Sequence, residues 1–140
     1  MQRRRKNQKG SAMVESAFIF TVLFIMLLGI FDLGRILFVH QALTDRVRAA
    51  TRWGAANGAS NTTGITNMVL YNAATQPNGA TGYFGLTSDK VTVTQSGSGT
   101  ADNRLTVSIT GYTYKTVTPF FTRTLTGPKI QVTQALGVFN

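Results

Sequence analysis

The sequence has no cysteine, a single histidine (His40) and only five acidic residues among 140. Without cysteine, the chain can form no disulfide, no thiolate nucleophile and no cysteine-ligated metal site. One histidine and so few carboxylates also leave little material for metal binding or acid–base catalysis. We therefore expect no enzyme activity, no metal or other cofactor, and no small-molecule substrate.

Positive charge is abundant but unevenly placed. The chain has 14 basic residues and a formal charge of +9. Such an excess can indicate nucleic-acid binding, anionic lipid or orientation in a membrane. Nucleic acid is not an expected partner, because the only dense cluster has no interleaved aromatic residues and adjoins an apolar segment. That cluster, residues 1–10, contains Arg3, Arg4, Arg5, Lys6 and Lys9.

Residues 11–31 form a long apolar run in which Thr21 is the only polar residue after Ala17. As a helix, this run would extend roughly 31 Å, which matches the ~30 Å hydrocarbon core of a bilayer. A buried helix of a globular protein would show a polar face, and this one shows none. We predict a single transmembrane helix that contacts the lipid bilayer. The basic cluster places the N-terminus in the cytoplasm and the C-terminal domain outside it.

The pattern changes in residues 32–54. Apolar residues now recur at three- and four-residue steps, which predicts that the helix continues as an amphipathic one. Two i, i+3 pairs, Asp32 with Arg35 and Asp45 with Arg48, favour it. Gly54 and Gly58 are expected to end it. The stripe that needs covering contains Ile36, Val39, Leu43, Val47, Ala50 and Trp53.

Residues 55–140 are predicted to form an extracytoplasmic α+β domain. Residues 60–73 can hold one short helix. Residues 90–95, 103–115 and 129–139 alternate like strands and predict a three-stranded antiparallel sheet that covers the helix stripe, with a bulge at Gly111. Residues 117–128, which include Phe120 and Phe121, are expected to form a loop or a short helical turn, because prolines exclude a central strand.

Glu15 is unexpected at its position, because a carboxylate within a span costs about 2.5 kcal/mol or more at mid-depth. A cleaved secretory signal explains the segment poorly, because the apolar run is too long and no small-residue cleavage site follows it. In a plain membrane anchor, Glu15 would reach the interface and be favoured there by the helix dipole.

A second explanation comes from the order of signals. A Lys/Arg run, then Gly10, then an apolar helix with Glu15 at the fifth position after the glycine resembles the type III signal sequence of type IV prepilins. The resemblance implies cleavage between Gly10 and Ser11 by a membrane-embedded prepilin peptidase. It also implies that Glu15 pairs with the new terminal amine of a neighbouring subunit, which would set the register between helices.

Roughly the first 55 residues contain a set of motif residues, which are Gly10, Val14, Glu15, Asp32, Gly34, Arg35, Gln41, Ala42, Leu43, Arg48 and, in shifted form, Arg52. This set resembles the TadE-like family of tight-adherence (Flp-type) pilus assembly proteins. The family's phenylalanine after the glutamate and its proline within the span are replaced by Ser16 and Thr21. The resemblance implies a pilin-like fold and a minor pilin or pseudopilin of the bacterial inner membrane, with other pilin-like subunits and the pilus assembly machinery as partners. An uncleaved, membrane-anchored binding domain is the alternative.

Overall fold

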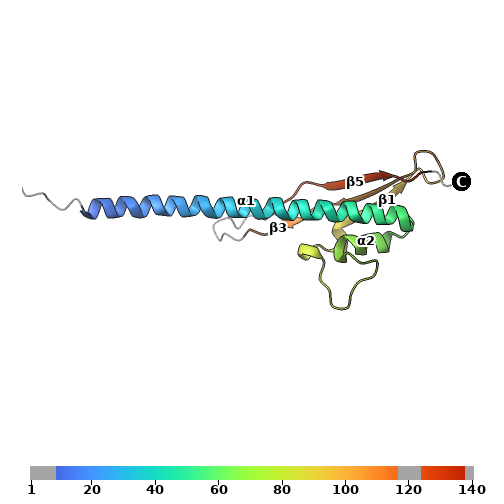
Figure 1. Ribbon diagram of the computed structural model, residues 1–140, viewed down its shortest axis with the longest axis horizontal. Coiled ribbons are helices and arrows are strands. Elements are labelled where there is room, and N and C mark those ends of the chain that lie inside the picture. The colour runs from blue at the N-terminus through green and yellow to red at the C-terminus, as the bar shows by residue number, and fades with distance from the viewer. Residues whose placement is uncertain (1–8, 117–123, 138–140) are drawn as a thin grey trace, which may run out of the picture.

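A computed structural model describes residues 9–116 and 124–137 and has an α+β fold built on one long helix (Figure 1). The predicted fold class, a long N-terminal helix on a small three-stranded antiparallel sheet, is confirmed. The helices are α1 (Lys9–Asn57) and α2 (Thr62–Tyr71), with single 3-10 turns η1 (Tyr83–Gly85) and η2 (Ser88–Lys90). The strands are β1 (Val91–Ser96), β2 (Arg104–Ile109), β3 (Thr113–Tyr114), β4 (Leu125–Thr126) and β5 (Ile130–Ala135).

Helix α1 has 49 residues, so it is roughly 73 Å long at ~1.5 Å per residue. It contains no proline, and Figure 1 shows it without a sharp kink. The predicted end at Gly54 is wrong, because Gly54 lies inside the helix and is buried. A Cβ there would lie 2.7 Å from Ile65 and 2.8 Å from Leu105, so this glycine lets α2 and β2 approach α1. The other predicted stop, Gly58, is confirmed: it has φ +106° and directly follows the helix end at Asn57.

The main sheet has the order β1-β2-β5, and both pairs are antiparallel. Strand β2 is therefore central, with its Val107 opposite Val93 on one side and Val132 on the other. Strands β1 and β2 form a hairpin, and its loop is held by Thr100 N–H donating to the Gly97 carbonyl at 3.0 Å.

Gly111 interrupts the segment that was predicted as one strand over residues 103–115. Its φ of +66° is in the left-handed region, where glycine is favoured. The chain leaves the sheet there and continues as β3, which pairs with β4 in a separate two-stranded sheet. Part of the predicted 117–128 loop is thus a strand at Leu125–Thr126, while Phe120 and Phe121 lie outside the described residues.

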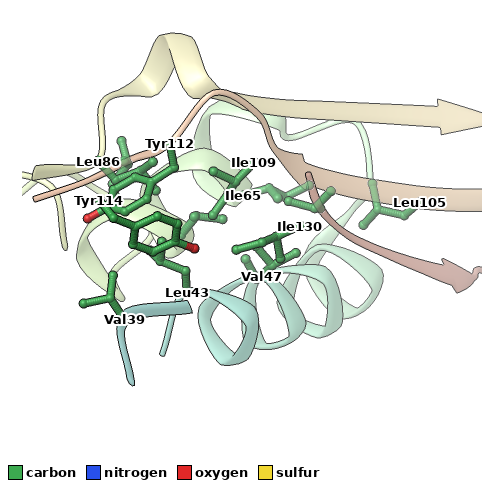
Figure 2. Close-up of a cluster of buried hydrophobic side chains, with 14 of the residues drawn as sticks. Val39, Leu43, Val47, Ile65, Leu86, Leu105, Ile109, Tyr112, Tyr114 and Ile130 are labelled. Carbon is green, nitrogen blue, oxygen red and sulfur yellow. The ribbon is translucent and has the colours of Figure 1, made fainter. Parts of the chain in front are cut away.

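The core lies between the second half of α1, helix α2 and the inner face of the sheet. Figure 2 shows Val39, Leu43 and Val47 of α1 directed toward Tyr114, Ile109 and Ile130. The predicted short helix exists as α2, capped by Asn61, whose side chain accepts from Gly64 N–H at 3.0 Å. The largest of the fully or almost fully buried side chains are Leu43, Val47, Thr51, Ile65, Val69, Leu86, Leu105, Val107 and Ile109.

Candidate functional site: the exposed half of α1 and its junction with the domain

Residues 10–31 of α1 have no covering layer in the described part of the chain. All of them are exposed except Gly29, which is half-buried. Helix α1 is long and apolar enough to cross a membrane, and none of its most apolar window is buried. The large apolar side chains exposed in this half are Met13, Val14, Phe18, Ile19, Phe20, Val22, Leu23, Phe24, Ile25, Met26, Leu27, Leu28, Ile30 and Phe31.

Two polar side chains of this half, Thr21 and Glu15, differ in how their hydrogen-bonding groups are satisfied. The Thr21 hydroxyl donates to the Ala17 carbonyl at 2.8 Å, so it is satisfied within its own helix. Such i−4 bonding is the usual way to place threonine in an apolar environment. The Glu15 side chain has no such bond, because no described residue makes an ion pair or hydrogen bond with it.

The Gly10–Ser11 bond lies in the first turn of α1, because the helix begins at Lys9. A Cβ added at Gly10 would meet nothing within 4 Å, so packing within this chain does not require a glycine there. Ser11 and Glu15 are four residues apart and therefore share a helix face. Of the predicted orientation residues, Arg3, Arg4, Arg5 and Lys6 lie outside the described residues.

The other motif residues do not converge on one place. Asp32 is buried and has an interaction partner, whereas Gly34, Arg35 and Gln41 are exposed. The predicted Asp45–Arg48 pair forms at 3.2 Å. The predicted Asp32–Arg35 pair is not among the ion pairs of the described residues.

A pocket of about 240 Å³ lies where α1 passes from the exposed half to the packed half. Helix α1 contributes one wall, and the chain around η1 and β3 contributes the other. Sequence reasoning missed this pocket, because its two walls are at least 45 residues apart in the chain. Its lining residues are Arg35, Ile36, Val39, Phe84, Gly85, Tyr112, Tyr114 and Lys115.

Two tyrosines fix the second wall to its neighbours. Tyr112 donates its hydroxyl hydrogen to the Phe84 carbonyl at 2.9 Å, and the Tyr114 hydroxyl bonds His40 Nδ1 at 2.8 Å. Burial raises the pKa of both phenols, and the nearby Tyr114 raises the pKa of Tyr112 further, while Arg35 lowers it in part. In the sequence, the apolar residues from Leu105 to Ile109 occupy odd-numbered positions, whereas both tyrosines occupy even-numbered ones. This change of parity at Gly111 is the sequence signal that both tyrosines turn inward.

Phe84, which lines this pocket, has an unusual backbone conformation. Its φ of +51° is in the left-handed region, which non-glycine residues seldom adopt. Its ring packs edge-on against Phe38 of α1, with centroids 6.2 Å apart, and against Tyr83 at 4.3 Å. Tyr83 in turn lies under the Arg46 guanidinium, 4.3 Å away. These contacts hold the η1 turn against α1.

Most of helix α1, which carries these features, matches a known protein family. Residues 10–52 match the family model described as TadE-like protein. This TadE-like segment, residues 10–52, begins at the glycine before the apolar run and ends within α1. The suspected resemblance is therefore confirmed over that segment. No curated protein and no solved structure gives a significant match.

Proposed function

We propose that the protein is a minor pilin or pseudopilin that takes part in assembly or anchoring of a tight-adherence (Flp-type) pilus after removal of its leader. The observation that carries this proposal is the position of the TadE-like segment. It spans both the exposed half of α1 and the half that packs on the domain, which suits a pilin-like subunit with a membrane helix and an attached head.

In this proposal, residues 1–10 are a leader, residues 11–31 span the bacterial inner membrane once, residues 32–54 are the amphipathic continuation and residues 55–140 are the extracytoplasmic domain. The leader cations keep the N-terminus in the cytoplasm. The partners are prepilin peptidase, other pilin-like subunits, the pilus assembly machinery and the lipid bilayer. The chain is a substrate of the peptidase and performs no chemistry of its own.

Cleavage requires the first turn of α1 to open, because a peptidase binds its substrate with an extended backbone. The geometry favours opening: the first amides of a helix have no intrahelical partner, and glycine extends without a steric cost. The new amine at Ser11 would then lie one turn from Glu15. In a bundle of such helices, Glu15 can pair with the amine of a neighbouring subunit, as buried polar pairs set register elsewhere.

The test is the intact mass and N-terminal sequence of the membrane-extracted protein, from cells with and without their prepilin peptidase. We expect an N-terminus at Ser11 only when the peptidase is present. Gly10→Val should block cleavage, whereas Gly29→Val, at another glycine with open space around it, should not. A retained leader in both strains would contradict the proposal and support the uncleaved anchor.

The role of Glu15 is tested separately with Glu15→Gln. We expect normal cleavage but reduced crosslinking between subunits and reduced incorporation into pili. Asp45→Asn, which neutralises an exposed carboxylate of the packed half, serves as the control. Unchanged assembly of Glu15→Gln would leave Glu15 as a carboxylate that merely reaches the membrane interface.

A further inference from the structure

The pocket at the junction combines two cations with an apolar floor. Arg35 and Lys115 line it from opposite walls, together with Ile36, Val39 and Phe84. Both cationic residues are exposed. Neither forms an ion pair with any residue in the described ranges, and no acidic residue lines the pocket. Such a set of donors fits a phosphate group, which arginine can bind through two parallel hydrogen bonds.

The pocket also lies at the right depth. Arg35 is four residues beyond Phe31, the predicted end of the span, which is roughly 6 Å along the helix axis. The headgroup layer occupies about 5–8 Å on each side of the hydrocarbon core. Arg35 and the mouth of the pocket therefore lie at the depth of the lipid phosphates.

An apolar track leads from the pocket into the span. Phe31, Leu28 and Phe24 precede Arg35 at three- and four-residue steps and so share its face of α1. All three are exposed. An acyl chain can lie along this track while its headgroup occupies the pocket. A free anion would gain nothing from the same surface.

The geometry points to a binding site for an anionic phospholipid, with the phosphate held between Arg35 and Lys115 and an acyl chain lying along the exposed half of α1. The site goes beyond the proposed pilus function, because it requires only the membrane span. The lipid would bridge α1 and the η1–β3 wall, and so fix the domain against the outer surface of the membrane.

The experiment is native mass spectrometry of the full-length protein in detergent, titrated with dioleoyl phosphatidylglycerol or with dioleoyl phosphatidylcholine. We expect the wild-type protein to retain phosphatidylglycerol preferentially. The double variant Arg35→Gln/Lys115→Gln should bind it about tenfold more weakly, as expected when charge-assisted hydrogen bonds are lost. The charge-retaining variant Arg35→Lys/Lys115→Arg should recover most of the binding.

The matched control is Arg52→Gln/Lys129→Gln, which removes the same charge from exposed residues outside the pocket. The leader cations are identical in all these proteins, so their attraction for anionic lipid cancels in the comparison. Equal loss in the control and the pocket variant would overturn the proposal, as would equal retention of the two lipids.

Two further outcomes would also overturn it. If inorganic phosphate displaces the lipid completely, the pocket recognises a soluble anion and the acyl track contributes nothing. If the pocket variant abolishes a dimer that carries no lipid, the occupant is a second copy of the chain. Retained binding that resists inorganic phosphate and depends on Arg35 and Lys115 supports the lipid site.

Discussion

The two halves of α1 share one backbone geometry but have different surroundings. In residues 10–31 large apolar side chains point in every direction and none is buried, whereas residues 32–57 bury a single stripe under the sheet and α2. Leu27 and Leu43 illustrate the contrast, because the first is 58% exposed and the second 0%. The comparison shows that helix formation and helix burial are specified separately. Covering the apolar side chains of the first half requires an apolar environment outside the described chain. The sheet and α2 cover the apolar stripe of the second half.

The largest expected effect comes from truncating the same residue type in each half. Leu43→Ala should lower the free energy of unfolding by about 2–5 kcal/mol, because it leaves a cavity in a closed core. Leu27→Ala should leave it almost unchanged, because Leu27 is exposed and lies in the half of α1 that no other described element covers. The measurement is urea unfolding of the full chain in detergent, followed by the fluorescence of Trp53, the only tryptophan. Similar losses for both variants would show that the exposed half is coupled to the domain.

Glycine-to-alanine substitutions are expected to change the free energy of unfolding in opposite directions in the two halves of α1. Gly54→Ala should cost about 1–3 kcal/mol, because the added methyl group meets the buried Ile65 and Leu105 side chains. Gly29→Ala in the exposed half, with nothing within 4 Å, should instead be neutral or gain up to ~1 kcal/mol in helix propensity. The same unfolding measurement applies. A stabilised Gly54→Ala would mean that α2 and β2 can move away from α1 at little cost.

The smallest effect concerns pH and is confined to the packed half. Burial raises the pKa of Tyr112 and Tyr114 above the ordinary value of 10.0. The neutral phenols therefore contribute stability that is complete below about pH 10 and is lost as pH rises through the folded-state pKa values. Tyr112→Phe/Tyr114→Phe should flatten the decline in urea midpoint above pH 10. Leu43→Ala, which lowers stability without removing a titrating group, should keep the wild-type slope; equal slopes in all three proteins would refute the assignment.

The elements with strong local periodicity could be predicted from the sequence. The stripe from Val39 to Ala50 and the alternation in β1, β2 and β5 each encode which face is buried, and the structure agrees. Of the two glycines expected to end α1, only Gly58 does so, because Gly54 instead allows α2 and β2 to approach the helix closely. Only the positions of Ile65 and Leu105, distant in sequence, reveal that role.

The candidate site was predictable only in its local parts. The order of Gly10, the apolar run and Glu15 can be seen in a single stretch of chain, and so suggested a resemblance without any structure. The junction pocket depends on Arg35 meeting Tyr112 and Lys115 across the fold. It also depends on the turn at Gly111, which was expected to bulge the strand but ends it. No spacing rule connects residues that are brought together by tertiary packing.

The absence of a break in α1 has a mechanical consequence. The sheet and α2 pack directly on the same helix that carries the exposed half, so no described linker separates the head from the span (Figure 1). Any movement of α1 along or about its axis is transmitted to the whole domain. A register shift of one residue between neighbouring helices would raise the domain by about 1.5 Å and turn it by about 100°. The height and the facing direction of the head are therefore set together, by the packing of the exposed half of α1 against its neighbours.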